Sequence, residues 1–259
     1  MITRTTTRIA AYVLLVLAGV IGGGGLLAFM LFLFAGSFNL VDLRLGEFPA
    51  LLLNALLCLA FFIQHSSMAR QSFYQRSERF LPAHFGGAVY AVASGVVVLA
   101  LVVFWQESAY RLLAPQGFVR WIFRAILVLA FAGVAWTIWT LGLFTNFRLR
   151  STVAELRSTE PQAASLITYG PYRWVRHPLY LSALLMIWSY PDLTLDRLLL
   201  NVSFTVWVIA ATRVEERKLV ATFGEEYRNY QLKVPMLIPW PLASGRHGEI
   251  RVKVVDNSG

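Results

Sequence analysis

The segment 169–180 concentrates side chains that could bind a charged aromatic ligand, just before an apolar stretch. A Gly-Pro pair near its start predicts a turn, and His177-Pro178 predicts a rigid entry into a helix, because proline suits the first helical position. The free N–H groups of such a helix start attract a carboxylate or another anion. With them, the aromatic residues and the two arginines of this turn could hold an adenosyl group and its amino-acid end. The alternative is an interfacial belt, in which Tyr and Trp lie at headgroup depth and Arg meets lipid phosphate.

A second polar group, residues 213–217, follows the last apolar stretch. Its adjacent carboxylates, Glu215 and Glu216, are costly at a membrane boundary unless a cation lies nearby. The ammonium and sulfonium groups of S-adenosylmethionine would be such cations. Arg213 precedes Glu216 by three residues, so the two share a helix face, and this spacing favours an Arg213–Glu216 salt bridge instead.

A third group, residues 64–70, contains His65 and Arg70. An imidazole can accept a proton at neutral pH, so His65 is a candidate general base. The alternative is a capping or packing role for His65, and one sequence by itself favours that role over catalysis. We predict no metal site, because no histidine is suitably spaced from His65 and His177 and the chain has one cysteine, Cys58.

The elements that must position these groups are membrane helices. Hydrophobic residues make up 57% of the chain and charged residues 14%, against about 25% in soluble domains, and the mean hydropathy is +0.59. The net charge of +9 fits the cytosolic ends of membrane helices, and we do not expect nucleic-acid binding. The apolar stretch from Ile9 is too long for a signal peptide. Its glycine run at 22–25 predicts a weakened helix or close approach of a neighbour.

We expect an all-α polytopic membrane protein with about six membrane helices, because about 20 apolar residues cross a bilayer. Pro191 and Asp192 would make the last two a tight hairpin. In this topology 18 Lys and Arg residues lie on one side and 5 on the other. The positive-inside rule then places both termini and all three polar groups on the cytosolic side of the cytoplasmic membrane. The expected spans are 9–36, 48–64, 86–105, 121–143, 178–190 and 194–211.

After the last span the pattern becomes charged and amphipathic. We expect a helix to about Thr222, a break at Gly224 and a short cytosolic amphipathic helix over 225–232. Three prolines then end regular structure, and residues 246–259 form a loose tail.

Taken together, the three groups resemble the isoprenylcysteine carboxyl methyltransferase superfamily, which includes phospholipid N-methyltransferase relatives. The resemblance rests on Arg-His-Pro-Leu-Tyr at 176–180, Glu-Glu at 215–216, Phe-Gly-Glu-Glu-Tyr-x-x-Tyr at 223–230 and Val-Pro at 234–235. It implies an S-adenosylmethionine-dependent enzyme whose cofactor pocket faces the cytosol. Four spans (1–145), with a substrate-side loop at 65–85, would precede a methyltransferase core (146–245). The implied cofactor-binding residues are Tyr172, Arg176, His177, Pro178, Tyr180 and Glu216, with Glu215 as a weaker candidate; Arg213 would lie near the methyl acceptor.

The N-terminal half is similar to the bacterial methanethiol S-methyltransferases, through Gln-His-Ser-x-Met-Ala-Arg at 64–70 and Phe73. That subgroup implies a small thiol, methanethiol, as the acceptor and dimethyl sulfide as the product. Arg213, His65 or Arg70 would stabilise the thiolate, with His65 as the candidate base. The rival acceptor is lipophilic, an isoprenylcysteine carboxylate or a phospholipid amine entering from membrane lipid. The rival from another class is a non-catalytic membrane scaffold.

Overall fold

The computed structural model describes residues 4–77, 79–80, 82–142, 149–157 and 165–239, and these are predominantly helical. The predicted tail at 246–259 lies outside them. In chain order the elements are α1 (Arg4–Leu17), η1 (Ala18–Gly23), α2 (Gly24–Ala35), α3 (Glu47–Met68), α4 (Gln71–Ser77), η2 (Ala83–Phe85), α5 (Gly86–Phe104), β1 (Arg111–Leu113), α6 (Gly117–Leu141), α8 (Arg150–Arg157), η3 (Gly170–Arg173), α9 (Pro178–Trp188), β2 (Leu193–Thr194), α10 (Leu195–Phe223) and α11 (Glu225–Lys233).

Within the described residues, five helices are long and apolar enough to cross a membrane. They match five of the six expected spans. The expected fifth span is α9, whose 11 residues extend about 16 Å, against about 30 Å for a hydrocarbon core. The predicted hairpin therefore pairs a short helix with the long α10. The five long helices are Thr7–Ala35, Glu47–Met68, Gly86–Phe104, Gly117–Leu141 and Leu195–Phe223.

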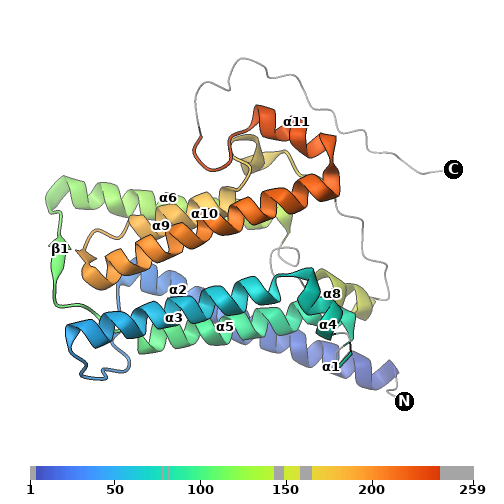
Figure 1. The fold of residues 1–259 in the computed structure, drawn as a ribbon, viewed down its shortest axis with the longest axis horizontal. Coiled ribbons are helices and arrows are strands. Elements are labelled where there is room, and N and C mark those ends of the chain that lie inside the picture. The colour runs from blue at the N-terminus through green and yellow to red at the C-terminus, as the bar shows by residue number, and fades with distance from the viewer. Residues whose placement is uncertain (1–3, 78, 81, 143–148, 158–164, 240–259) are drawn as a thin grey trace.

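Figure 1 shows two groups of helices running side by side, with α1, α2, α3 and α5 in one and α6, α9 and α10 in the other. α10 packs on both α9 and α3 and so joins the groups. The buried core lies between them and includes Phe32, Leu101, Trp105, Leu127 and Leu200. Large apolar side chains also cover the outside, as at Trp139, which is 89% exposed, and this surface suits contact with lipid tails.

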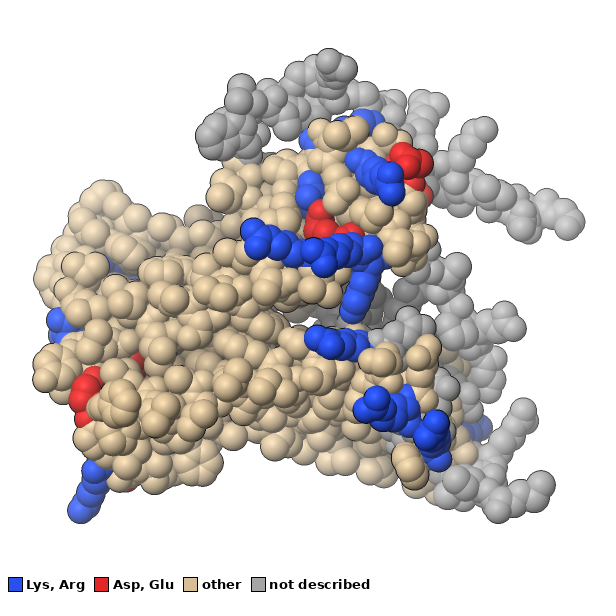
Figure 2. Space-filling view, viewed as in Figure 1, with Lys and Arg blue, Asp and Glu red and all other residues tan. Residues whose placement is uncertain are grey.

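The two ends of the bundle differ. One end carries α4, α8, α11 and the start of α1, and Figure 2 shows Lys and Arg gathering over it in the same view. At the other end, β1 and β2 pair antiparallel, with Arg111 opposite Thr194. The sequence did not predict this ladder, because strands of three and two residues show no measurable alternation.

The glycine run brings the first span against α5. A Cβ added at Gly22 would lie 2.8 Å from the Ala91 carbonyl oxygen, and residues 18–23 adopt π-helical turns. The predictions of close approach and of a disturbed helix are both confirmed.

Gly22→Ala should therefore lower the free energy of unfolding by about 1–3 kcal/mol, because the backbone must move to make room for the added Cβ. Gly23→Ala, where a Cβ meets nothing within 4 Å, is the matched control in thermal unfolding in detergent. Equal unfolding temperatures would contradict the close approach.

Candidate functional site

The turn before α9 is held by the segment that follows α11. Pro178 begins α9 and His177 is its N-cap residue, as predicted. The backbone N–H of Arg176 donates to the Pro235 carbonyl at 2.9 Å, and that of His177 donates to the Met236 carbonyl at 3.2 Å. These two N–H groups therefore already have partners and are not free to bind an anion.

Glu216 lies at the centre of the site and accepts hydrogen bonds from four side chains. Arg176 binds it with two nitrogens, Nε to Oε1 at 2.9 Å and Nη2 to Oε2 at 2.8 Å. His177 Nε2 lies 2.7 Å from Oε1, the Tyr227 hydroxyl donates to Oε1 at 2.6 Å, and Gln231 Nε2 donates to Oε2 at 2.5 Å. The carboxylate thus ties together the turn before α9, the end of α10 and α11.

The predicted Arg213–Glu216 salt bridge is wrong. Glu216 is buried and pairs with Arg176 from a different element, and Arg213 is exposed on α10. Helix spacing offered only a local partner, whereas the fold brings in a guanidinium forty positions away whose planar fork matches both carboxylate oxygens. Arg176 also donates to the Gln231 and Val234 carbonyls, so its charge and donors are committed to holding the C-terminal segment.

Glu215 is the open carboxylate of the pair. Its side chain is 46% exposed, against 11% for Glu216, and its Oε2 lies 4.0 Å from His177 Nδ1. Burial, followed by the negative charge of Glu215, raises the pKa of the half-buried Tyr172 phenol, which places that phenol in the same electrostatic environment. The Tyr180 ring stacks on His177 with centroids 5.7 Å apart. All seven predicted cofactor residues therefore lie together.

Tyr227 should make the stability of this region depend on alkaline pH. Burial and its hydrogen bond to Glu216 raise the pKa of the Tyr227 phenol above its usual value of about 10. Because the folded pKa is raised, this contribution is complete below about pH 10 and is lost as the pH rises through the folded value. Tyr227→Phe should therefore cost about 1–3 kcal/mol at neutral pH, with a smaller difference from wild type in strong alkali.

Thermal unfolding as a function of pH tests this prediction. Tyr110→Phe is the control, since Tyr110 is exposed at the other end of the bundle. A difference between wild type and Tyr227→Phe that stays constant into alkali would contradict it.

His65 lies in a separate aromatic cluster deeper along the helices. Its Nε2 is 2.8 Å from the Tyr90 hydroxyl, and its ring contacts Phe61 and Trp207. Trp207 precedes Glu216 by nine residues on α10, a separation of about 13 Å along the axis. The printed contacts of His65 thus belong to a cluster about two and a half turns of α10 away from Glu216. Arg70 is exposed just after α3.

Four side chains that contact Glu216 or His65 were not among the predicted site residues: Tyr227 and Gln231 at Glu216, and Tyr90 and Trp207 at His65. Tyr227 belongs to the motif at 223–230, so its position was visible although its partner was not. Gln231 follows that motif directly, and no pattern distinguishes it. Tyr90 and Trp207 lie inside apolar spans, where an aromatic residue is expected as packing.

Comparison with known proteins places these features in a family. The profile described as "Phospholipid methyltransferase" matches residues 118–226. The chain is 35% identical over 198 residues to a methanethiol S-methyltransferase from Pseudomonas deceptionensis, with 73% of each chain covered. It is 32% identical over 195 residues to one from Mycobacterium tuberculosis, covering 74% of this chain and 79% of the relative. The chain belongs to the methanethiol S-methyltransferase family.

Membership in this family makes the chain a membrane methyltransferase, and the scaffold alternative is therefore not supported. The similarity to the mouse protein-S-isoprenylcysteine O-methyltransferase is shorter, 32% identity over 93 residues, covering 33% of this chain and 31% of the mouse enzyme. No solved structure matches the chain significantly. The wider resemblance stated from the motifs and the subgroup stated from the N-terminal half are both confirmed.

Proposed function

We propose that this enzyme transfers a methyl group from S-adenosylmethionine to methanethiol, giving dimethyl sulfide. The observation that carries the proposal is the site built on Glu216. Arg176, His177 and Tyr227, which bind Glu216, belong to the motifs of the family, and Glu215 lies open beside His177. Relatives named for methanethiol match across both halves of the chain, whereas the isoprenylcysteine enzyme covers only a third of it. This difference favours the thiol over a lipophilic acceptor.

The side chains of the site fit the cofactor by their chemistry. S-adenosylmethionine supplies a methyl group on a positively charged sulfur, and it also carries an ammonium group and an adenine ring. Glu215 provides an exposed carboxylate for a cation, and the stacked His177 and Tyr180 rings provide an aromatic surface. We assign cation binding to Glu215 and a positioning role to Glu216, because Arg176 already compensates the Glu216 charge.

The acceptor would lie deeper in the bundle than Glu215. The cluster around His65 offers aromatic rings, which suit a small thiol because sulfur packs well against them. His65 would accept the thiol proton, and Tyr90 would hold the imidazole. Arg213, one turn before Glu216, would favour the thiolate by its charge. The protein's main tasks are then to align acceptor and methyl and to exclude water.

The orientation follows from the distribution of charge. We propose that the enzyme lies in the cytoplasmic membrane of a bacterium, with the Glu216 site and both termini on the cytosolic side. The count of 18 basic residues against 5 supports this, as does their gathering over one end of the bundle in Figure 2.

The test is methyl transfer by the detergent-purified protein, with methanethiol, a farnesylated cysteine analogue and phosphatidylethanolamine as alternative acceptors. The expected result is dimethyl sulfide in the headspace, with no methylated lipid and no methylated prenylcysteine. Product from a lipophilic acceptor alone would overturn the thiol assignment and keep the reaction class. A folded sample that binds no S-adenosylhomocysteine in calorimetry and methylates nothing would overturn the proposal.

A further inference from the structure

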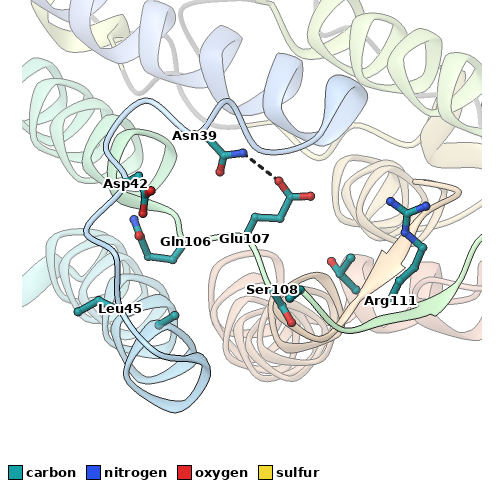
Figure 3. A pocket seen from close by; sticks show the side chains of 10 residues that line it. Asn39, Asp42, Leu45, Gln106, Glu107, Ser108 and Arg111 are labelled. Carbon is teal, nitrogen blue, oxygen red and sulfur yellow. Dashed lines mark hydrogen bonds between the residues drawn. The ribbon is translucent and has the colours of Figure 1, made fainter.

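The methyl acceptor must reach the end of α10 that carries Glu215, and a cavity at the opposite end of the bundle does not serve it. That cavity, of about 510 Å³, lies between the α2–α3 connection and the segment after α5, and Figure 3 shows Asp42 and Glu107 in its wall. Thr194, which also lines it, is the N-cap residue of α10, about 30 Å along the helix axis from Glu215. A thiol that is methylated beside Glu215 must therefore bind nearer to it, on the side of the His65 cluster.

Trp207 connects the His65 cluster to the part of α10 that carries Glu215. Its indole lies edge-on to the His65 ring, with centroids 5.2 Å apart and an interplanar angle of 83°. Trp207, Ala211 and Glu215 follow one another at intervals of four residues along the same side of α10. Trp207 and Glu215 thus lie about 12 Å apart along the axis, with only the Ala211 methyl group from α10 between them. A small acceptor held there would have the imidazole at one end and the cofactor at the other.

The indole of Trp207 is fixed in two ways. Its Nε1 donates to the Ser66 hydroxyl oxygen at 3.1 Å, across the contact between α10 and α3. Its face stacks on the Phe62 ring, with centroids 5.2 Å apart and an interplanar angle of 10°. The ring cannot move aside without losing both a hydrogen bond and a stacking contact. The wall that Trp207 presents beside His65 is therefore rigid.

Other aromatic rings also surround His65. The centroids of Phe61 and Tyr90 lie 5.1 and 5.2 Å from that of the imidazole. Phe204 stacks on Phe61 with centroids 5.7 Å apart, and both belong to the buried core, where close packing resists displacement. Trp207 is half-buried and lies towards Glu215. It is therefore the ring that a longer acceptor would meet.

We propose that Trp207 limits the acceptor to a small thiol, an inference that rests on the proposed function. Each methylene of a longer alkanethiol would have to displace an indole that Ser66 and Phe62 hold in place. A hydrophobic site distinguishes ligands that differ by one methylene by about 10–200-fold. In the wild-type enzyme, kcat/KM should therefore fall by about tenfold or more from methanethiol to ethanethiol, and again from ethanethiol to propanethiol.

Headspace analysis of the methyl thioethers formed from these three thiols by the detergent-purified protein tests the proposal. Trp207→Leu removes both the ring and its N–H, so the ratio of kcat/KM for ethanethiol to kcat/KM for methanethiol should rise by about tenfold. Ser66→Ala removes only the hydrogen bond that fixes the indole, so this ratio should rise less, by about threefold.

Trp188→Leu is the matched control. The Trp188 indole likewise donates to a hydroxyl of a neighbouring helix, that of Thr205 at 2.9 Å. Thr205 is two residues before Trp207, so it lies on a different side of α10. The ratio for Trp188→Leu should therefore equal that of wild type.

Calorimetry with S-adenosylhomocysteine shows whether each variant keeps its cofactor site, and we expect wild-type affinity in all three. A Trp207→Leu protein with this affinity and the wild-type ratio would overturn the assignment, as would an equal rise in Trp188→Leu or equal kcat/KM for the three thiols in wild type. If Trp207→Leu does not fold, Ser66→Ala decides: a raised ratio supports the assignment and an unchanged ratio overturns it. Failure of the proposed function looks different, because wild type would then methylate no thiol, and this inference would be overturned with it.

Discussion

Glu216→Gln should lower both stability and turnover, whereas Glu215→Gln should lower only the affinity for cofactor. Glutamine keeps the shape of Glu216 but removes the charge that Arg176 and His177 share. Leaving a buried guanidinium without its carboxylate typically costs about 3–5 kcal/mol. The loss would release the turn before α9 from α11, so excess cofactor should not restore the rate.

The neighbouring substitution is the matched control. Glu215 is half exposed and makes one weak contact, 4.0 Å from His177 Nδ1, so Glu215→Gln should unfold at the wild-type temperature. If its carboxylate meets the cationic part of the cofactor, the dissociation constant for S-adenosylhomocysteine should rise about tenfold and saturation should recover turnover. Unfolding temperature, calorimetry and rate at saturating cofactor separate the two variants. A Glu216→Gln protein with wild-type stability and only weakened binding would make Glu216 the direct ligand.

The membrane spans and the helical break were predictable because each depends on local sequence. Hydropathy located the five long helices, and Gly224, with φ of 54°, separates α10 from α11 at the expected residue. α9 was harder, because apolar residues extend up to Pro191 whereas the helix ends at Trp188. Length alone then predicted a span where the structure has a half-length helix.

The contacts within the site depend on residues far apart in the chain, and this set the limit of prediction. The motifs selected the side chains that gather around Glu216, but helix spacing assigned its charge to Arg213, because a single helix shows only neighbours three or four residues apart. Which of two adjacent carboxylates is buried depends on the packing of α11, which no local pattern reports.

His65→Phe distinguishes catalysis from packing at the second cluster. Phenylalanine keeps an aromatic ring between Phe61 and Trp207 but provides no base. If His65 removes the thiol proton, His65→Phe should fold normally and lose about 10²-fold or more in kcat, with cofactor affinity unchanged. Tyr90→Phe, which keeps the imidazole and removes its hydrogen-bond partner, should lose less.

The pH profile provides the decisive readout. A histidine base loses function when it is protonated, so wild-type turnover of methanethiol should fall towards acid pH and level off once the imidazole is neutral. The residual activity of His65→Phe would depend on thiolate formed in solution, so it should keep rising with pH and show no such plateau. Wild-type activity in His65→Phe, together with a lower unfolding temperature in His65→Ala, would make the residue a packing histidine. It would also favour an acceptor that is already ionised, because a carboxylate needs no base whereas a thiol must lose its proton before it can attack the methyl group.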